Sequence, residues 1–393
     1  MKLYIDPGTG SMLFAVLIGI IGAVAYVFKE WAVKLKFLLT GGKKADTNTE
    51  KIPIVIFSDD KRYWSVFKPI CEEMNSRGID VVYMTASKDD PAFDENLQHL
   101  DAQFIGEGNR AFSKLNFLNA TMLISTTPGL DVFQWKRSKN VDYYVHVLHA
   151  ASNTCGYHMF GIDYYDAVLI SGNHHERDIR ALEKIRNLPA KELVMVRVPY
   201  MDAMVNRLAA APPLENKERT VLLAPSWGKS SILNKFGDEI IKTLLETGYH
   251  IIIRPHPQSF TSEADLMNHL MTEFPNSNSL EWNSDNFDVL RRSDILISDF
   301  SGIVYDYSLV YRKPVIYADV EFDDSPYDAW WLDTPFWPIA SLPKIGKQLT
   351  KDNMQNLKEL IDSCIESTEY KNNIDSLIEE TWQYKGEGAV RTA

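Results

Sequence analysis

The feature that most constrains the fold is a repeated alternation between short apolar segments and amphipathic segments. The apolar segments are rich in β-branched residues, as in Ile52–Ser58 (IPIVIFS), whereas the amphipathic ones carry apolar residues at helical spacing, as in Ser65–Arg77. This alternation is typical of a parallel sheet covered by helices on both faces, because each strand of such a sheet is buried on both sides. The sequence therefore predicts an α/β protein.

The alternation runs in two series that are separated at Ala209–Pro213 (AAAPP). The strands expected in the first series are Ile52–Ser58, Asp80–Thr85, Ala102–Ile105, Met122–Ser125, Tyr143–Leu148 and Ala167–Ile170. Those expected in the second are Val221–Ala224, His250–Ile253, Ile295–Ser298 and Val315–Tyr317. We therefore predict two doubly wound, Rossmann-like domains, residues 51–210 and 211–393, with a cleft between them and helices at the end of the second.

Residues 1–50 carry a different signal. No charge occurs in Pro7–Phe28, and Met12–Phe28 is almost wholly apolar, which approaches the ~20 residues that a helix needs to cross a bilayer. Five lysines follow: Lys29, Lys34, Lys36, Lys43 and Lys44. The positive-inside rule then predicts one transmembrane helix at the cytoplasmic membrane, with the remaining chain in the cytoplasm. A cleaved signal peptide is the alternative, but the apolar run lacks a small-residue cleavage site.

Composition narrows the classes of partner. The formal net charge of −12 argues against nucleic-acid binding, which needs a positive face. Cys71, Cys155 and Cys364 are too widely spaced for a disulfide framework or a CxxC zinc site. The sequence has no D-x-D motif, so we predict neither a metal site nor another cofactor.

The first candidate site residues follow the strand that ends at Ile253. Ligands of open α/β sheets bind beyond the carboxyl ends of the strands. Here that position holds Arg254-Pro255-His256-Pro257, where two prolines restrict the backbone around His256 and Arg254 offers a forked donor suited to phosphate. The alternative is an exposed turn in which the histidine has no function.

A second candidate site follows Ser298, in the stretch Asp299-Phe300-Ser301-Gly302 and a predicted helix that contains Asp306. Ser301 is a favourable N-cap, and Gly302 would let an anion approach the backbone N–H groups at the helix start. These residues predict a phosphate site. In the alternative interpretation, Asp299 and Asp306 only cap and solvate the helix.

His149 and Ser226 complete the candidates. His149 follows the predicted strand Tyr143–Leu148 and is a candidate general base because an unperturbed histidine titrates near neutrality; His158 is the next candidate. Ser226 lies after Ala224 in a segment that resembles a phosphate loop but lacks its upstream glycine. The GxSxG motif and the kinase signature set are also absent from the sequence, which disfavours hydrolases and kinases.

Arg254-Pro255-His256-Pro257, the stretch Ser298–Tyr307 (SDFSGIVYDY) and Lys313–Tyr317 (KPVIY) together resemble the CDP-glycerol glycerophosphotransferase family of teichoic-acid primases and polymerases. The resemblance is closest over 221–319 and covers 52–200 only in architecture. It implies a GT-B-like fold in which an acceptor hydroxyl attacks the β-phosphorus of CDP-glycerol, or of a similar CDP-alditol, and CMP leaves. It also implies a lipid-linked or glycan acceptor and a role in cell-envelope glycopolymer synthesis.

The resemblance also implies roles for single residues. His256 matches the histidine of the family's Arg-x-His-Pro motif, implicated with the donor pyrophosphate, and Ser301 and Asp306 match contacts to the cytidine diphosphate. His149 falls at the position of a catalytic histidine but lacks the usual Trp-His-Gly-Thr-Pro context, and Gly302 stands where a second serine is common. Three alternatives remain: a GT-B glycosyltransferase, a relative of the nucleotide-sugar 2-epimerases, and an inactive membrane-tethered scaffold.

Overall fold

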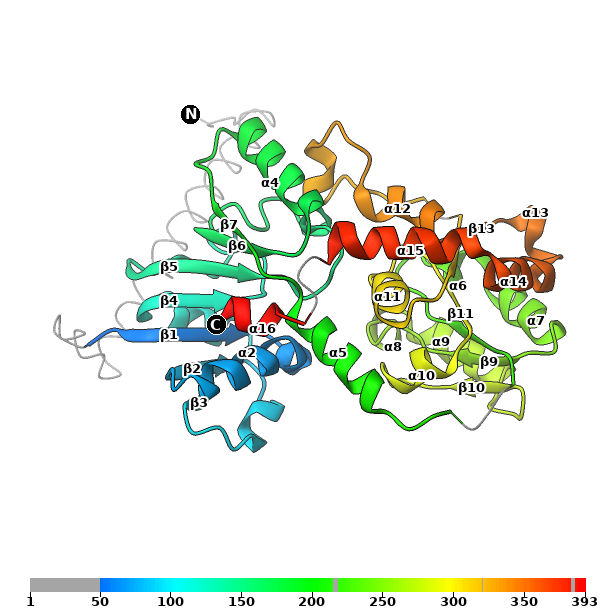
Figure 1. The fold of residues 1–393 in the computed structure, drawn as a ribbon, viewed down its shortest axis with the longest axis horizontal. Coiled ribbons are helices and arrows are strands. Elements are labelled where there is room, and N and C mark those ends of the chain that lie inside the picture. Colours follow the sequence, from blue (N-terminus) through cyan, green and yellow to red (C-terminus); the bar gives the residue numbers. More distant parts are fainter. Residues whose placement is uncertain (1–49, 215–217, 320, 383–385) are drawn as a thin grey trace, which may run out of the picture. The chain divides into compact units, whose positions relative to one another are not determined.

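A computed structural model of the chain describes residues 50–214, 218–319, 321–382 and 386–393 (Figure 1). No helix within these ranges is long and apolar enough to cross a membrane. The predicted transmembrane segment Met12–Phe28 lies outside the described residues.

The first half of the described chain is built on a seven-stranded parallel sheet in the order β3-β2-β1-β4-β5-β6-β7. Its strands are β1 (Ile52–Ser58), β2 (Val81–Thr85), β3 (Leu100–Phe104), β4 (Asn119–Ser125), β5 (Asn140–Val147), β6 (Ala167–Ile170) and β7 (Glu192–Met195). In the register, Val55 of the central β1 pairs with Val82 on one side and with Leu123 on the other. The strand order reverses direction between β1 and β4, as in a doubly wound fold.

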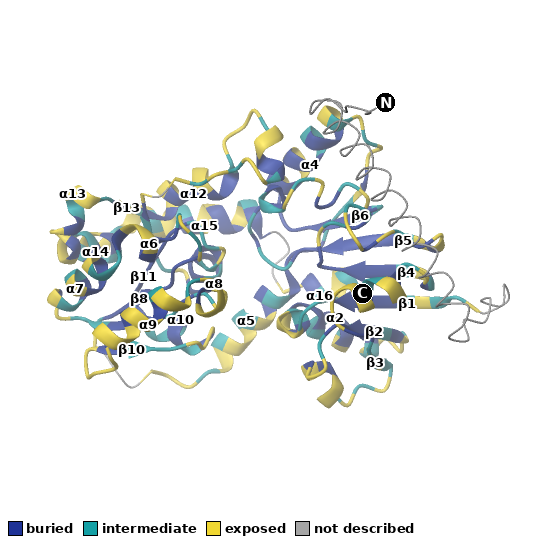
Figure 2. Cartoon of the chain, turned by 180° about the vertical axis from the view of Figure 1, so that it is seen from behind, coloured by how far each residue is buried: buried dark blue, intermediate teal, exposed yellow. Residues whose placement is uncertain are grey.

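Helices cover both faces of this sheet, and the strands between them are buried (Figure 2). The helices are α2 (Trp64–Ser76), α3 (Asn109–Leu115), α4 (Asn173–Arg186) and α5 (Pro199–Ala210), with short turns η1 (Lys61–Tyr63), η2 (Pro91–Asp94) and η3 (Thr154–Gly156). On one face, α2 packs Phe67, Ile70 and Met74 into the core, and on the other face Leu115 packs beside Trp135. The one-sided apolar spacing that predicted α2 is the reason for this packing.

The second half repeats the arrangement with a six-stranded parallel sheet in the order β10-β9-β8-β11-β12-β13. Its strands are β8 (Thr220–Leu223), β9 (His250–Ile253), β10 (Leu280–Trp282), β11 (Ile295–Ser298), β12 (Val315–Ala318) and β13 (Gly346–Leu349). Its helical elements are α6 (Ile232–Phe236), α7 (Asp238–Glu246), α8 (Ser259–Ser262), α9 (Ala264–Glu273), α10 (Asp288–Arg292), α11 (Ile303–Tyr305), η4 (Asp306–Val310), η5 (Asp328–Trp331), α12 (Trp337–Ile345), α13 (Lys351–Met354), α14 (Leu357–Glu366), α15 (Thr368–Thr381) and α16 (Gly388–Thr392). The predicted α/β class with two parallel sheets is confirmed.

A buried ion cluster joins the two halves. Arg186 of α4 donates to Asp163 at 2.7 Å and to Asp328, in the excursion after β12, at 2.5 Å. All three side chains are almost fully buried. Beside them, His158 forms a backbone bridge with Tyr327 and stacks on its ring. Charges from both halves therefore neutralise each other inside this contact.

The C-terminal helices also return to the first half. The end of α15 passes so close to Gly172 that a Cβ at this glycine would lie 2.6 Å from the carbonyl oxygen of Glu380. The following α16 packs against α2 and α5, and the Asp202 carboxylate of α5 accepts a 2.9 Å hydrogen bond from the N–H of Gly388. Residues 52–393 accordingly form one unit, and the division into 51–210 and 211–393 stays a prediction.

Candidate functional site

A cavity of about 560 Å³ lies where loops from both sheets meet. Six of the eight predicted site residues line it: His149, Arg254, His256, Ser301, Gly302 and Asp306. The same cavity is lined by residues that sequence reasoning missed: Ser65, Ser152, Tyr200, Met204, Arg207, Asn286, Phe287 and Leu290 among them. Of the four strand ends expected to carry the site, after Leu148, Ala224, Ile253 and Ser298, the structure brings those after β5, β9 and β11 to this cavity, whereas the loop after β8 does not line it.

Arg254, directly after β9, is the main positive charge of the cavity. Its backbone N–H continues the sheet by donating to Leu223 at 2.9 Å, which fixes the start of the side chain. Burial lowers the pKa of its guanidinium, and the nearby carboxylates of Asp306 and Asp285 act in the opposite direction. The buried Nε has no hydrogen-bond partner among the described residues. The residue as a whole is only partly buried, but a buried donor without a partner is costly, so this geometry suits an anionic ligand.

His256 is held in one tautomer by its own turn. The backbone N–H of Gln258 donates to Nδ1 at 3.1 Å, so Nδ1 is an acceptor and Nε2 carries the proton of the neutral ring. Burial and the positive charges of Arg254 and Arg62 lower the pKa of the imidazole. His256 therefore offers a neutral N–H donor to a ligand in the cavity.

His149 lies two residues after β5, on the first-half wall. Its Nδ1 shares a 3.0 Å hydrogen bond with the Thr126 hydroxyl and lies 3.4 Å from the Tyr157 hydroxyl, while the Tyr63 ring packs against its own ring at 5.2 Å. Burial, followed by the charge of Arg62, lowers the pKa of His149 to about 4. The ring is therefore neutral at physiological pH. Because both hydrogen bonds use Nδ1, Nε2 is the nitrogen that remains for a substrate.

Asp306 connects the second half to α5 of the first. The Tyr200 hydroxyl on α5 donates a short hydrogen bond to Asp306 Oδ1. Burial raises the pKa of the Asp306 carboxyl to about 6, although the hydrogen bond from Tyr200 and the charge of Arg254 act to lower it. Asp306 opens the wide helical turn η4, and such turns are frequent at functional sites.

Ser301 and Gly302 line the cavity differently from the prediction. The helix begins after Gly302 and has no side-chain N-cap, so Ser301 does not cap it; instead its carbonyl accepts from the Val304 N–H at 3.1 Å. Gly302 has an ordinary helical φ of −58°. A Cβ at Gly302 would meet no atom within 4 Å, so the space beside it is open to a ligand.

Asp299 and Ser226 do not line this cavity. The buried Asp299 carboxylate accepts backbone hydrogen bonds from Ser226 at 3.0 Å, from Ile232 at 3.0 Å and from Ser301 at 3.2 Å. Burial raises the pKa of Asp299, while these N–H donors act to lower it. Asp299 thus ties the loop after β8 to the loop after β11 and positions Ser301. Donor contacts by Asp299 and Ser226 remain predictions.

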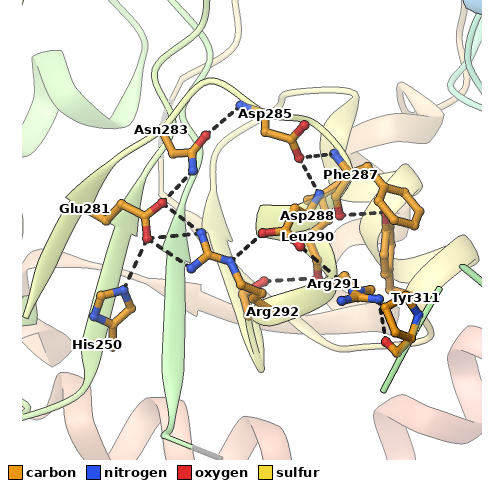
Figure 3. Close-up of polar contacts among 12 residues, drawn as sticks. His250, Glu281, Asn283, Asp285, Phe287, Asp288, Leu290, Arg291, Arg292 and Tyr311 are labelled. Atoms are coloured by element: carbon orange, nitrogen blue, oxygen red, sulfur yellow. Dashed lines mark hydrogen bonds and ion pairs between the residues drawn. The ribbon is translucent and has the colours of Figure 1, made fainter. Parts of the chain in front are cut away.

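The loop between β10 and α10 forms a wall of the cavity through Asn286 and Phe287, together with Leu290 of α10. Figure 3 shows the polar network behind this wall. Arg292 pairs with the Glu281 carboxylate at 2.8 Å and with Asp288 at 2.8 Å. Other contacts in this network join Asn283 and His250 to Glu281, Asp285 to the N–H groups of Phe287 and Asp288, and Tyr311 to the carbonyl of Phe287.

Arg207 of α5 covers the same wall, with its guanidinium 3.9 Å from the centre of the Phe287 ring. Sequence reasoning missed Tyr200 and Arg207 because it ended the first domain in the segment that forms α5. The available signal was Pro199, which is favourable at the first position of a helix. His158, the fallback base, lies outside this cavity at the contact with Tyr327.

Within the described ranges, no group of three or more His, Cys, Asp or Glu side chains is arranged to hold a metal ion. The three cysteines are buried and free. Burial raises the pKa of each thiol, so none is prepared to act as a thiolate.

Comparison with solved structures shows which folds this chain resembles. A histidine-to-asparagine variant of the wall teichoic acid polymerase TagF, soaked with CDPG, gives a TM-score of 0.57 at 16% identity, with 93% of this chain and 95% of that chain covered. S. aureus MnaA with UDP gives a TM-score of 0.57 at 11% identity and coverages of 87% and 94%. The UDP-GlcNAc 2-epimerase of Neisseria meningitidis bound to UDP-GlcNAc gives 0.52 at 11% identity and coverages of 87% and 98%. At these identities the likeness shows the fold alone, which is GT-B-like as predicted.

A sequence search of curated proteins gave no match. Residues 47–330, however, match the family model described as CDP-Glycerol:Poly(glycerophosphate) glycerophosphotransferase. The match contains the loops after β5, β9 and β11, and with them every predicted residue that lines the cavity. This chain is therefore an enzyme of the CDP-glycerol:poly(glycerophosphate) glycerophosphotransferase family.

Proposed function

We propose that this enzyme transfers glycerol phosphate, or a closely related alditol phosphate, from a CDP-activated donor to an acceptor hydroxyl and releases CMP. The observation that carries the proposal is Arg254, a cation in the cavity whose buried Nε has no partner among the described residues. A pyrophosphate would supply the missing acceptor oxygens. Its negative charge would also offset the cost of burying the guanidinium.

The reaction needs a positioned acceptor hydroxyl, stabilisation of the charge on the pyrophosphate and a group that accepts the hydroxyl proton. The acceptor oxygen attacks the donor's β-phosphorus, a new P–O bond forms, and the bond between the β-phosphorus and the bridging oxygen breaks, so that the electron pair leaves with CMP. Positioning and charge stabilisation dominate such transfers. Arg254 and the Nε2–H of His256 are placed to stabilise the pyrophosphate oxygens, while His149 Nε2 accepts the proton of the attacking hydroxyl.

The lowered pKa of His149 keeps the ring free to accept a proton but also makes it a weak base. The ring is neutral, and thus able to accept a proton, at any pH well above about 4. A base of low pKa is weak, so the proton moves late in the reaction, when negative charge near the ring favours the imidazolium. If residues 1–50 form the anchor that their sequence predicts, the transfer takes place at the cytoplasmic face of the membrane, onto a lipid-linked or glycan acceptor.

A nucleotide-sugar enzyme is the second candidate, because two of the similar folds belong to proteins bound to UDP or UDP-GlcNAc. Donor chemistry separates the two candidates. We would measure binding of CDP-glycerol, CDP-ribitol, UDP-GlcNAc and CMP to the full chain by calorimetry. We expect a CDP-alditol to bind at least 10-fold more tightly than UDP-GlcNAc, a difference of about 1.4 kcal/mol.

The same titration with Arg254→Met tests the observation that carries the proposal. Loss of a charged hydrogen-bond donor should weaken CDP-alditol binding about 10- to 100-fold. Arg219→Met is the matched control, since Arg219 lies in the same half, pairs with Asp362 and does not line the cavity. Equal or tighter binding of UDP-GlcNAc would refute the proposed function in favour of the second candidate.

A further inference from the structure

A second, smaller cavity of about 200 Å³ adjoins the first. The two cavities share five lining residues: Ser65, His149, Tyr200, Asn286 and Asp306. The smaller one is completed by Arg62, Tyr63 and Val66, which follow β1, and it contains neither Arg254 nor His256. His149 therefore lies on a wall shared by a cavity that contains Arg254 and His256 and a cavity that contains neither of these two residues.

Arg62 is the basic side chain of the smaller cavity, and its orientation is fixed by its neighbour. The Asp60 carboxylate accepts hydrogen bonds from the backbone N–H and from Nε of Arg62, both at 2.9 Å. This pairing uses one edge of the guanidinium and leaves both terminal nitrogens without a protein partner among the described residues. The positive charge of Arg62 is felt by His149 and also by His256, so it lies close to both sides of the reaction.

The in-line geometry of the transfer determines the side from which the acceptor approaches the donor. An in-line attack places the attacking oxygen opposite the leaving group. With the donor's CMP moiety held on the side of Arg254 and His256, the attacking hydroxyl has to reach His149 from the other side, which is the smaller cavity. The terminal nitrogens of Arg62 then lie within the space that the next part of the acceptor occupies.

We propose that the smaller cavity is the acceptor subsite and that Arg62 binds the phosphate group next to the attacking hydroxyl. Arg62 is thereby the residue that would recognise the charged end of the poly(glycerophosphate) acceptor that the family's description names. The forked guanidinium matches phosphate oxygens in a bidentate way. This inference rests on the proposed function, because it uses the donor's position to place the acceptor.

The test compares two acceptors that differ only in charge. The full chain is assayed with saturating CDP-glycerol and either a tri(glycerol phosphate) oligomer or the same oligomer with uncharged methylphosphonate linkages. We expect the wild type to prefer the charged oligomer. Arg62→Gln should raise KM for the charged oligomer about 5- to 30-fold and change KM for the neutral one less than about twofold, with an unchanged Kd for CDP-glycerol.

Lys61→Gln is the matched control, since Lys61 is the adjacent residue, pairs with Asp89 and lines neither cavity. It should leave both acceptors unaffected, and Arg62→Lys should restore part of the preference. An equal loss on both oligomers, or a wild type that prefers the neutral one, overturns the subsite while the donor function stands. If the wild type does not bind CDP-glycerol, the proposed function fails first and the subsite fails with it.

Discussion

The two histidines of the cavity differ in the group that hydrogen-bonds to Nδ1 of the ring. The sequence predicted His149 and His256 as a pair, and the structure brings both to the same cavity. Their different chemistry depends on partners: the Thr126 hydroxyl for His149 and the Gln258 N–H for His256. Gln258 is two residues from His256, whereas Thr126 follows a different strand from the one that precedes His149. Only the contact between Gln258 and His256 could therefore have been predicted from the local sequence.

These assignments predict different kinetics for the two alanine variants. His149→Ala should lower turnover about 10²- to 10⁴-fold, the usual contribution of a positioned base, and leave the Kd for CDP-glycerol within about threefold. His256→Ala should lower turnover about 10²- to 10³-fold and weaken donor binding as well. Turnover and calorimetry on both variants check this. A folded His149→Ala that keeps turnover within about threefold would make His149 structural.

The raised pKa of Asp306 gives a second residue-scale prediction. Since the pKa in the fold is about 6 against an ordinary 3.8, the native state binds this proton more tightly than the unfolded chain does. Ionised Asp306 therefore destabilises the ligand-free chain, and this effect grows as pH rises from about 3.8 to about 6 and stays constant above. Asp306→Asn should be more stable at pH 7.5 by roughly 3 kcal/mol at most, measured by urea unfolding.

The affinity for the donor should increase as pH rises, whereas the stability of the ligand-free chain decreases. If the carboxylate contacts the donor, the wild-type Kd for CDP-glycerol should rise as pH falls from 7 to 5, because Asp306 becomes protonated near pH 6. The Asn variant should bind more weakly at pH 7.5 and lack this pH dependence. A wild-type affinity that stays constant over this range would remove Asp306 from the donor site.

Interior strands could be predicted from the sequence more closely than edge strands. Of the four edge strands in the two described sheets only β3 was predicted, as Ala102–Ile105 against the observed Leu100–Phe104. Strands β1, β6, β9 and β11 have the predicted bounds, since central parallel strands are uniform apolar runs. Strands β7, β10 and β13 were not predicted, and each lies at an edge of its sheet. Edge strands are short and carry charged residues, as β10 (LEW) and β13 (GKQL) do, which removes the pattern that identifies a strand.

The helix after β11 shows a second limit at this scale. The sequence predicted a regular helix over Ser301–Tyr311, but the structure has one short turn, α11, and then the wider turn η4. A change in the spacing of the backbone hydrogen bonds does not alter the pattern of apolar residues over so short a segment. It depends on tertiary partners, and here Asp306 is held by Tyr200 from another helix.

The start of this helix carries the element-scale prediction. Gly302→Val is compatible with the backbone, because φ is −58° and the added Cβ meets no protein atom within 4 Å. The stability of the variant should therefore change by less than about 1 kcal/mol. Donor affinity should fall at least about 10-fold if phosphate occupies the space beside Gly302. Ala264→Val, at the start of α9 and outside the cavity, is the control, and an unchanged Kd for Gly302→Val would exclude this space from the donor site.

For the molecule as a whole, the sequence predicted two sheets and strand ends that meet at a cavity, but not how the halves hold together. The joining residues are scattered: Arg186 ends a helix, Asp163 lies in a loop, and Asp328 belongs to a Trp-rich stretch without periodicity. None of them has a signal in a linear pattern, because an ion pair over long separation depends on the finished fold. Six of the predicted residues nevertheless line one cavity, because strand ends converge by topology alone.

The buried cluster of Arg186, Asp163 and Asp328 also makes the contact between the two halves sensitive to the loss of any one of its charges. Removing one partner from such a cluster leaves an uncompensated buried charge, at a cost of about 3–5 kcal/mol. A variant that lacks one of these three charges should therefore loosen the contact that holds the cleft together on this side.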